Sequence, residues 1–405
     1  MKYKNKIIIA IGIIIFLIII YITSVLFIKK PNEEGNIITN FFPNILDFIQ
    51  DSDISIPLIN NVNNDQESEE PLLYQIPNHI SADFVFNTSS STITTSATSS
   101  LERTRNFIVS AEKTTGHLYF YDLDKKIMTR LSNTTISNID SIYNSYDKDK
   151  LYIYLSAQSD KSRQDYSYNF NPEVIESRVT NVIKLNPFID IIGGINNLLY
   201  WKNTDTNVIY KGNANLSNTE TILTNSQISW SYNYTNNELT ATQKPSALIS
   251  TSYYIVKNSG LEKILSNKKG LNIKPSPDGQ WVVYSTSNQT SVNTYLYNLK
   301  SNQSSILTIR TLADKCSWSR DSSLLYCAVP KSIPNGNYPD DWYSGLVSFE
   351  DNIFVILPNK STSVTNINTN IPRLDVEKIE VGSNDVDLII KNKTDNTLWV
   401  QKFIY

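Results

Sequence analysis

The feature that most constrains the fold of this chain is a short sequence motif that it repeats. Residues 275–284 read PSPDGQWVVY, and residues 318–327 read WSRDSSLLYC. Both place a polar turn before a run of apolar residues that suits a strand. Strand–turn–strand segments of this kind recur along the chain, and they span residues 140–156, 189–203, 228–242, 271–285, 314–328 and 377–391.

The repeated segments begin about 35–60 residues apart, a period typical of propeller blades when each unit adds one or two further strands. A first, less regular unit spans residues 78–132. One four-stranded sheet cannot bury both of its faces alone, so a ring of such sheets is the stable arrangement. The sequence therefore predicts an all-β propeller over residues 75–405, with seven four-stranded blades and six or eight as the alternatives.

Composition agrees with a β-rich body and excludes one class of partner. The chain contains 24 Tyr and 6 Trp, residue types that suit the half-buried surface of a sheet. The formal net charge is −3, with 36 basic and 39 acidic residues. Since no basic field is present to hold phosphates, no nucleic-acid partner is expected.

The best-defined repeat carries a family resemblance. The text SPDGQWVVYS (Ser276–Ser285) resembles the WD40-like (TolB-type) β-propeller repeats, whose core is S-P-D-G followed by an apolar strand. The text SRDSSLLYCA departs from this core because it lacks the proline and the glycine. The resemblance implies a propeller fold and a binding or scaffolding role, and it implies no particular activity.

The last unit, residues 375–405, supplies only three recognisable strands. A blade of three strands would leave an open edge, which natural sheets avoid. We expect its fourth strand to come from the start of the body, near Leu72–Ile76 or Ala82–Asn87, so that the ring closes.

The N-terminal segment is of a different kind. Ile7–Ile28 is a run of 22 residues without a charge, and at 1.5 Å per residue it reaches roughly 33 Å, enough to cross a hydrocarbon core. A cleaved signal peptide is the alternative, but its apolar region is shorter and ends in small residues, whereas this run ends in Val25-Leu26-Phe27-Ile28. Residues 1–30 are thus predicted to form an uncleaved transmembrane signal anchor, and residues 31–74 a flexible stalk.

Charges flanking the apolar run predict its orientation. Lys2, Lys4 and Lys6 precede it, and Lys29 and Lys30 follow it. The slight basic excess on the N-terminal side favours a cytoplasmic N-terminus, with the propeller outside the cell membrane.

The two cysteines, Cys316 and Cys327, flank the turn of one repeat at equal distances from its centre. A hairpin centred on that turn would place them opposite each other, and an exported protein would oxidise them to a disulfide. Two buried free thiols in a cytosolic body are the alternative.

No catalytic or metal-binding pattern is present. The chain has two histidines, His79 and His117, and zinc sites usually recruit several His or Cys ligands at close spacing. No G-x-S-x-G nucleophile motif and no calcium loop motif occur. We therefore expect no metal, no cofactor and no enzymatic activity.

The candidate binding residues lie in two insertions, residues 156–178 and 330–345, which we expect to be loops on one rim of the propeller. Aromatic residues beside carboxylates on loops are typical of binding sites. The candidates are Asp165, Tyr166, Tyr168, Tyr338, Asp340, Asp341, Trp342 and Tyr343. For Trp342 the alternative is that the ring folds inward and fills a gap between blades.

Two functions remain open from the sequence. The first is a membrane-anchored, extracytoplasmic module that binds an unknown protein or glycan and acts as a scaffold. The alternative is a cell-envelope hydrolase or lyase that uses carboxylates at the mouth of the propeller channel. The scarcity of histidine and the lack of a nucleophile motif favour binding.

Overall fold

The structure is a computed structural model, and the residues that it describes lie between Leu73 and Lys402. They are residues 73–96, 99–147, 150–158, 163–173, 182–185, 189–195, 198–224, 226, 230–235, 238–257, 260–288, 290–358, 363–366, 373–382 and 387–402. The predicted anchor (residues 1–30) and residues 31–72 of the predicted stalk lie outside these ranges. Among the helices within these ranges, none is long and apolar enough to cross a membrane.

The described residues form an all-β body, as predicted. Five sheets contain four antiparallel strands each, and strands that follow one another in the chain are neighbours in the sheet. These strands are β5 (Ile139–Asp147), β6 (Lys150–Gln158), β7 (Arg163–Phe170), β8 (Ile183–Leu185), β9 (Ile189–Ile195), β10 (Leu198–Asn203), β11 (Val208–Asn213), β12 (Glu220–Leu223), β13 (Trp230–Thr235), β14 (Glu238–Gln243), β15 (Ser250–Lys257), β16 (Gly260–Lys269), β17 (Asn272–Pro275), β18 (Trp281–Asn288), β19 (Ser291–Asn298), β20 (Gln303–Ile306), β21 (Cys316–Trp318), β22 (Leu325–Pro330), β23 (Asp351–Leu357) and β24 (Ser363–Asn366).

The remaining strands form one seven-stranded sheet in the order β25-β26-β27-β1-β2-β3-β4. They are β1 (Leu73–Ser96), β2 (Ser99–Glu112), β3 (Leu118–Asp122), β4 (Ile127–Arg130), β25 (Val376–Val381), β26 (Asp387–Asn392) and β27 (Thr397–Lys402). Two short helical segments complete the described body, the 3₁₀ turn η1 (Ala313–Lys315) and the helix α4 (Asp340–Tyr343).

The blade count differs from the expected seven separate sheets, since five separate four-stranded blades are present. The reason is that β1 runs on without interruption from one partner to the next. Leu73–Gln75 and Ile80 pair with β27, and the residues from Ser81 onward pair with β2. The first part of β1 also confirms the prediction of ring closure, with Leu73–Gln75 rather than Ala82–Asn87 supplying the fourth strand beside β27.

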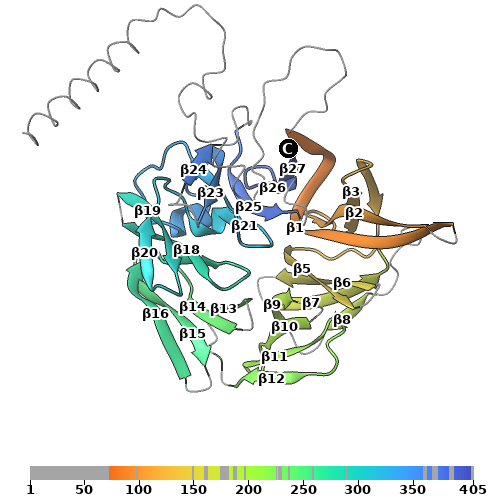
Figure 1. Ribbon diagram of the computed structural model, residues 1–405, viewed down its shortest axis with the longest axis horizontal. Helices are drawn as coiled ribbons and strands as arrows, with labels where there is room; N and C mark the ends of the chain where they lie inside the picture. The colour runs from red at the N-terminus through yellow and green to blue at the C-terminus, as the bar shows by residue number, and fades with distance from the viewer. Residues whose placement is uncertain are drawn as a thin grey trace, which may run out of the picture. The chain divides into compact units, whose positions relative to one another are not determined.

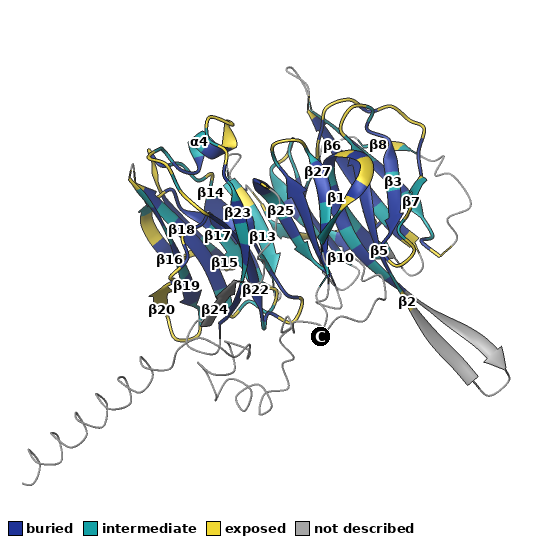
Figure 2. Cartoon of the chain, turned by 90° about the horizontal axis from the view of Figure 1, so that it is seen from above, coloured by how far each residue is buried: buried dark blue, intermediate teal, exposed yellow. Residues whose placement is uncertain are grey.

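Each of the six repeated segments forms the first hairpin of a unit, as the sequence predicts. The hairpins are β5–β6, β9–β10, β13–β14, β17–β18, β21–β22 and β25–β26. Viewed along the short axis, the sheets follow one another around a ring (Figure 1). Burial falls from the middle of a sheet outward. Strands β22 and β26 are buried throughout, whereas the outer strand β20 is exposed throughout (Figure 2).

The two matching texts fold into the same turn, which explains their likeness. In the first turn the Ser276 hydroxyl donates to Asp278 (2.5 Å) and accepts from the Trp281 amide (2.9 Å). In the second the Ser319 hydroxyl donates to Asp321 (2.6 Å) and accepts from the Leu324 amide (2.9 Å). A serine and an aspartate two residues later therefore hold both turns through side-chain-to-backbone bonds.

The hydrophobic core consists of clusters between neighbouring sheets. In one cluster, Val283 and Leu296 of the β17–β20 sheet pack with Trp318 of the next sheet. In another, Phe107 of β2 packs with Leu155 of β6. Each sheet thus buries its apolar faces against its neighbours, the arrangement that stabilises repeat architectures.

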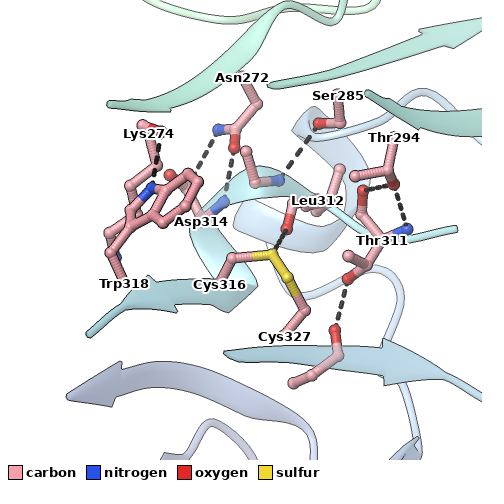
Figure 3. Close-up of a disulfide and its surroundings, with 12 residues drawn as sticks. Asn272, Lys274, Ser285, Thr294, Thr311, Leu312, Asp314, Cys316, Trp318 and Cys327 are labelled. Carbon is pink, nitrogen blue, oxygen red and sulfur yellow. Dashed lines mark hydrogen bonds between the residues drawn. A yellow bond between two sulfur atoms is a disulfide. The ribbon is translucent and has the colours of Figure 1, made fainter. Parts of the chain in front are cut away.

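The disulfide prediction is confirmed. Cys316 of β21 and Cys327 of β22 are directly opposite in the hairpin, with their Cα atoms 4.0 Å apart and a sulfur–sulfur bond of 2.08 Å (Figure 3). The bond lies beside polar contacts that join two sheets. Among them, the Trp318 indole donates to the Lys274 carbonyl at 3.2 Å, and the Asp314 amide donates to the Asn272 side chain at 2.6 Å.

One of the two loop predictions is wrong. We expected residues 156–178 to form an insertion, but Arg163–Phe170 is strand β7, which pairs with β6 over its whole length. The sequence RQDYSYNF places aromatic residues at positions 166, 168 and 170, an alternation typical of a strand, and both faces of this strand carry buried residues. The other predicted insertion, residues 330–345, lies between β22 and β23; it does form a loop, and it carries α4.

Candidate functional site: the channel mouth

A central channel of about 1300 Å³ passes between the innermost strands. Its lining residues come from seven strands or the turns that follow them: β1, β5, β9, β13, β17, β21 and β25. Every repeat therefore contributes its first strand to the same cavity. In propellers such a channel is where loops and strand ends of different blades converge.

One mouth of the channel carries a second cavity of about 340 Å³. We call it the channel mouth, and it is lined by Asp83, Asp140, Asp314, Trp342, Tyr343, Glu377, Lys378, Lys391 and Lys393. Asp83 and Lys378 also line the channel itself, so the two cavities share a wall. Trp342 and Tyr343 are the two members that the sequence predicted.

The insertion between β22 and β23 reaches the mouth because its carboxylates anchor it. The Ala247 amide, which precedes β15, donates to Asp340 Oδ2 at 2.7 Å. The Asn337 amide donates to Asp341 Oδ2 at 2.7 Å and closes the turn that begins α4. Asp340 and Asp341 thus hold the insertion in place, and this contact with the β13–β16 sheet fixes its direction.

Trp342 folds inward, which is the alternative that the sequence left open. Its side chain is only 2% exposed, and its indole Nε1 donates to Asp375 Oδ1 at 2.9 Å. The Lys315 ammonium lies 4.5 Å from the centre of the Trp342 ring, within the range of a cation–π interaction.

Beneath Trp342 lies a fully buried ion cluster. Lys315 Nζ is 2.9 Å from Asp351 Oδ2 and 2.8 Å from Asp375 Oδ1, and none of the three is more than 1% exposed. Burial raises the pKa of Asp351 to about 6, against the attraction of Lys315. For Asp375 burial acts in the same direction, but the charge and hydrogen bond of Lys315 outweigh it and lower the pKa.

Tyr343 is the exposed aromatic residue of the mouth, with 40% of its surface accessible. Its hydroxyl donates to Asp314 Oδ2 and accepts from Asn272 Nδ2, the latter at 2.9 Å. Burial of the hydroxyl and the adjacent Asp314 charge raise the pKa of Tyr343 above its ordinary value. The hydroxyl is therefore fixed while the residue stays partly open to solvent.

Tyr338 supports the insertion from below. It is 1% exposed, its hydroxyl donates to the Pro334 carbonyl at 2.9 Å, and its ring lies 5.7 Å from that of Phe349. A residue so placed positions α4 and has no free face for a ligand.

The three candidates in β7 are not in the channel mouth. The Ile189 amide donates to Asp165 Oδ2 at 2.8 Å, and Arg163 pairs with the same carboxylate at 3.0 Å. Tyr168 is fully buried in the core between two sheets, and Tyr166 is half-buried at its edge. Asp165 and Tyr168 are therefore structural in this fold.

Sequence reasoning missed the charged wall of the mouth. Lys378 Nζ lies 2.9 Å from Asp83 and 2.9 Å from Glu380. Burial alone would lower the pKa of Lys378, but these two carboxylates outweigh it and raise the pKa. Asp83 lies 295 positions from Lys378 in the sequence, and only closure of the ring brings them together, so no local pattern marks them.

His79 has a structural environment. His79 is 3% exposed and its Nε2 lies 2.7 Å from the Ser110 hydroxyl. Burial lowers the pKa of His79 to about 4, so the ring is neutral at pH 7. Within the described part of the chain, no group of three or more His, Cys, Asp or Glu side chains is placed to hold a metal ion.

No known protein family and no curated protein matches this sequence. Several solved propellers resemble it at low identity. Oligogalacturonate lyase from Vibrio parahaemolyticus is 11% identical over 79% of this chain and 98% of its own, with a TM-score of 0.47. The Swd1 β-propeller domain from Myceliophteria thermophila is 11% identical over 74% of this chain and 93% of its own, with a TM-score of 0.44.

A chain of the mitotic checkpoint complex is 11% identical over 86% of this chain and 100% of its own, with a TM-score of 0.49. All three scores lie below 0.5, so these likenesses carry no functional argument. The strand order and the shared channel define the body as a β-propeller. It is similar to WD40 domains and to the oligogalacturonate lyase propeller.

Proposed function

We propose that the protein is a binding module whose channel mouth takes a neutral, hydroxyl-rich ligand, in the manner of a glycan. The observation that carries the proposal is a partly exposed aromatic residue, Tyr343, in the same cavity as fixed hydrogen-bond donors and acceptors. An aromatic face offers a stacking surface, and rigid polar groups around it give orientation.

The charges of the mouth support a neutral ligand. Four carboxylates and three lysines line it, so the site is nearly balanced. Several of these charges already have partners: Lys391 pairs with Glu377 at 2.7 Å, and Lys378 pairs with Asp83. Ligand hydroxyls can join such pairs as both donors and acceptors without leaving a buried charge unpaired.

A hydrolase or lyase is the competing function, and the carboxylates of the mouth offer it little support. Asp314 accepts from Asn272 and Tyr343, and Asp83 accepts from the Ile142 amide at 2.9 Å as well as from Lys378. A general acid or base has to be free to exchange a proton with the substrate. Asp140, which accepts a hydrogen bond from the hydroxyl of its neighbour Ser141 at 3.3 Å, is the carboxylate that a catalytic role would use.

The test is a screen of the full-length protein on an array of neutral oligosaccharides, followed by titration of those retained. We expect Tyr343→Ala to weaken binding about tenfold through loss of the stacking surface. Tyr343→Phe, which keeps the ring, should retain most of the affinity. Leu346→Ala is the matched control, since Leu346 is 79% exposed and does not line the mouth.

Three outcomes would count against the binding function as stated. If no sugar is retained, or if Tyr343→Ala and the native protein bind the sugar with equal affinity, the channel mouth is not the binding site. Turnover of a retained sugar that Asp140→Asn abolishes would establish the hydrolase or lyase instead.

We infer further that the module is held at a membrane by Ile7–Ile28, with the propeller outside. The length and apolar character of that segment support the anchor, and a disulfide between Cys316 and Cys327 suits an oxidising compartment. Alkaline carbonate extraction of membranes carrying the full chain tests the anchor, because release into the soluble fraction is incompatible with it.

We also count the seven-stranded sheet as two blades that share β1, which makes seven units in the ring. The support is the change of partner within β1, from β27 to β2 between Ile80 and Ser81. The seven strands that line the channel agree with this count.

A further inference from the structure

A third cavity, of about 510 Å³, lies between the β17–β20 and β21–β24 sheets. We call it the seam pocket. It is lined by Thr290, Ser291, Val292, Thr308, Ile309, Arg310, Val329, Pro330, Lys331, Ser332, Ile333 and Phe354. None of these residues lines the channel mouth, so the seam pocket is a separate site.

The floor of the seam pocket is apolar. Val292, Ile309 and Val329 are 1%, 5% and 8% exposed, and they come from three different segments that meet at the seam. Phe354 and Ile333 are half-buried beside them. A bulky apolar side chain placed on this floor would leave water for a surface that is already formed.

The rim of the pocket is polar and carries one cation available to a ligand. Arg310 is exposed, and among the described residues no carboxylate pairs with it. Lys331, the other basic residue, is already paired with Glu350. A guanidinium in this position offers a two-pronged hydrogen-bond donor that matches a carboxylate.

Hydroxyl groups complete the rim. Thr290, Ser291, Thr308 and Ser332 line the pocket, and Thr290, Thr308 and Ser332 are exposed. Such groups can bond the amide N–H and C=O of an extended main chain. The Thr290 and Ser291 hydroxyls already donate to Asn288 Oδ1, each at 3.0 Å. A fatty acid would use the floor and Arg310 but would leave the Thr308 and Ser332 hydroxyls without a partner, so the lining favours a peptide.

We propose that the seam pocket binds an extended peptide segment in which a bulky apolar residue stands next to an aspartate or glutamate. The apolar side chain occupies the floor of Val292, Ile309 and Val329, and the carboxylate pairs with Arg310. The volume of the pocket lies within the range of small-ligand sites, so it accommodates a few residues of the peptide and no more.

The experiment uses two capped peptides that differ only in charge, acetyl-Leu-Phe-Asp-Leu-amide and acetyl-Leu-Phe-Asn-Leu-amide, titrated against the full-length protein. We expect the acidic peptide to bind about tenfold more tightly at low salt, as for one charge-assisted pair. In Arg310→Ala this ratio should fall to near one, and Arg310→Lys should restore part of it.

Arg373→Ala is the matched control, because Arg373 is an exposed arginine that contacts Glu350 at 3.5 Å and does not line the pocket. The ratio of the affinities of the Arg373→Ala variant for the two peptides should equal that of the native protein. Thr308→Trp, which fills the pocket from the exposed rim, should abolish binding of both peptides while the unfolding transition stays in place.

Equal affinity of the two peptides for the native protein would overturn the proposal, and so would a ratio that Arg310→Ala leaves unchanged. Binding of decanoate without binding of either peptide would also overturn it, in favour of a free amphiphilic acid. Because the mouth variants do not touch the seam pocket, the outcome is independent of the glycan test.

Discussion

At the scale of single residues, the second of the two matching turns holds an unusual backbone conformation. Gly279 in the first turn has φ +70°, and its counterpart Ser322 has φ +64°. The left-handed region is unfavourable for a residue with a side chain. Ser322 has a compensating contact, since its hydroxyl accepts from the Asp278 amide at 3.0 Å and ties the two turns together.

His79 gives a pH prediction at the same scale. Its pKa is about 4 in the fold, against an ordinary value of 6.5, because burial disfavours the charged ring. The unfolded chain therefore binds more protons than the folded one between these values. The contribution of His79 to the free energy of unfolding is fully present above pH 6.5. It is lost as the pH falls toward 4, and the loss amounts to up to about 3 kcal/mol.

The measurement is urea unfolding of the native protein and of His79→Gln at several pH values from 7.5 to 4.5. Gln cannot take up a proton, so the variant should lose less stability over this range than the native protein does. Parallel curves for the two proteins would show that His79 is not the residue responsible.

At the scale of elements, the buried cluster of Lys315, Asp351 and Asp375 links three parts of the chain. Lys315 ends η1, Asp351 begins β23, and Asp375 directly precedes β25. Trp342 of α4 bonds to the same Asp375. The Lys315 ammonium thus holds in place both the insertion that carries α4 and the contact between the β21–β24 sheet and β25.

Lys315→Met tests this link, because Met keeps much of the side-chain volume and removes the charge. Asp351 and Asp375 would remain buried with no cation between them, and such a loss destabilises proteins by about 3–5 kcal/mol. Lys331→Met is the control, since Lys331 and its partner Glu350 are exposed enough for water to replace the pair. Denaturant unfolding that shifts equally in both variants would contradict a structural role for the cluster.

The elements also show where sequence reasoning succeeds. The six hairpins and the pairing of Cys316 with Cys327 depend on turns and on alternation over a few residues, so a local pattern predicts them. The direction of Trp342 depends on Asp375, which is 33 positions away. No local pattern carries that information, and the sequence left both orientations open.

The same limit applies to β7. Its aromatic residues alternate as in a strand, but the surrounding polar text resembles a loop. The segment forms a strand because it pairs with β6 and because Tyr168 is buried between two sheets. Both interactions require the ring to be formed. The charged wall of Asp83 and Lys378 was unpredictable for the same reason.

At the scale of the whole molecule, the entry point of the chain bears on the proposed function. Leu73 pairs with Gln401, which pairs in turn with Leu388, and Leu388 pairs with Val381 at the far end of β25. The channel mouth lies at the beginning of β25, beside Asp375 and Trp342. In the anchored arrangement proposed above, Leu73 therefore lies at the end of the body opposite the mouth.

Ring closure yields the last prediction. The first residues of β1 pair with β27, and Ile76, which is fully buried, packs with Leu398 and Val400 in one cluster. Deleting residues 73–80 would remove this strand, leave the edge of β27 open and expose that cluster to water. The loss of Ile76 alone is worth about 2–5 kcal/mol, as for other large core side chains.

Because each sheet is stabilised by its two neighbours, an opening at this one seam should weaken the whole ring. We expect the variant without residues 73–80 to unfold at a clearly lower temperature in a single transition, with loss of amide protection also in β13–β16, on the far side of the ring. A variant without residues 31–72 should keep the native transition, since the closing strand remains. If the deletion of residues 73–80 loosened only β25–β27, the sheets would be independent folding units, and closure would protect an edge without stabilising the molecule.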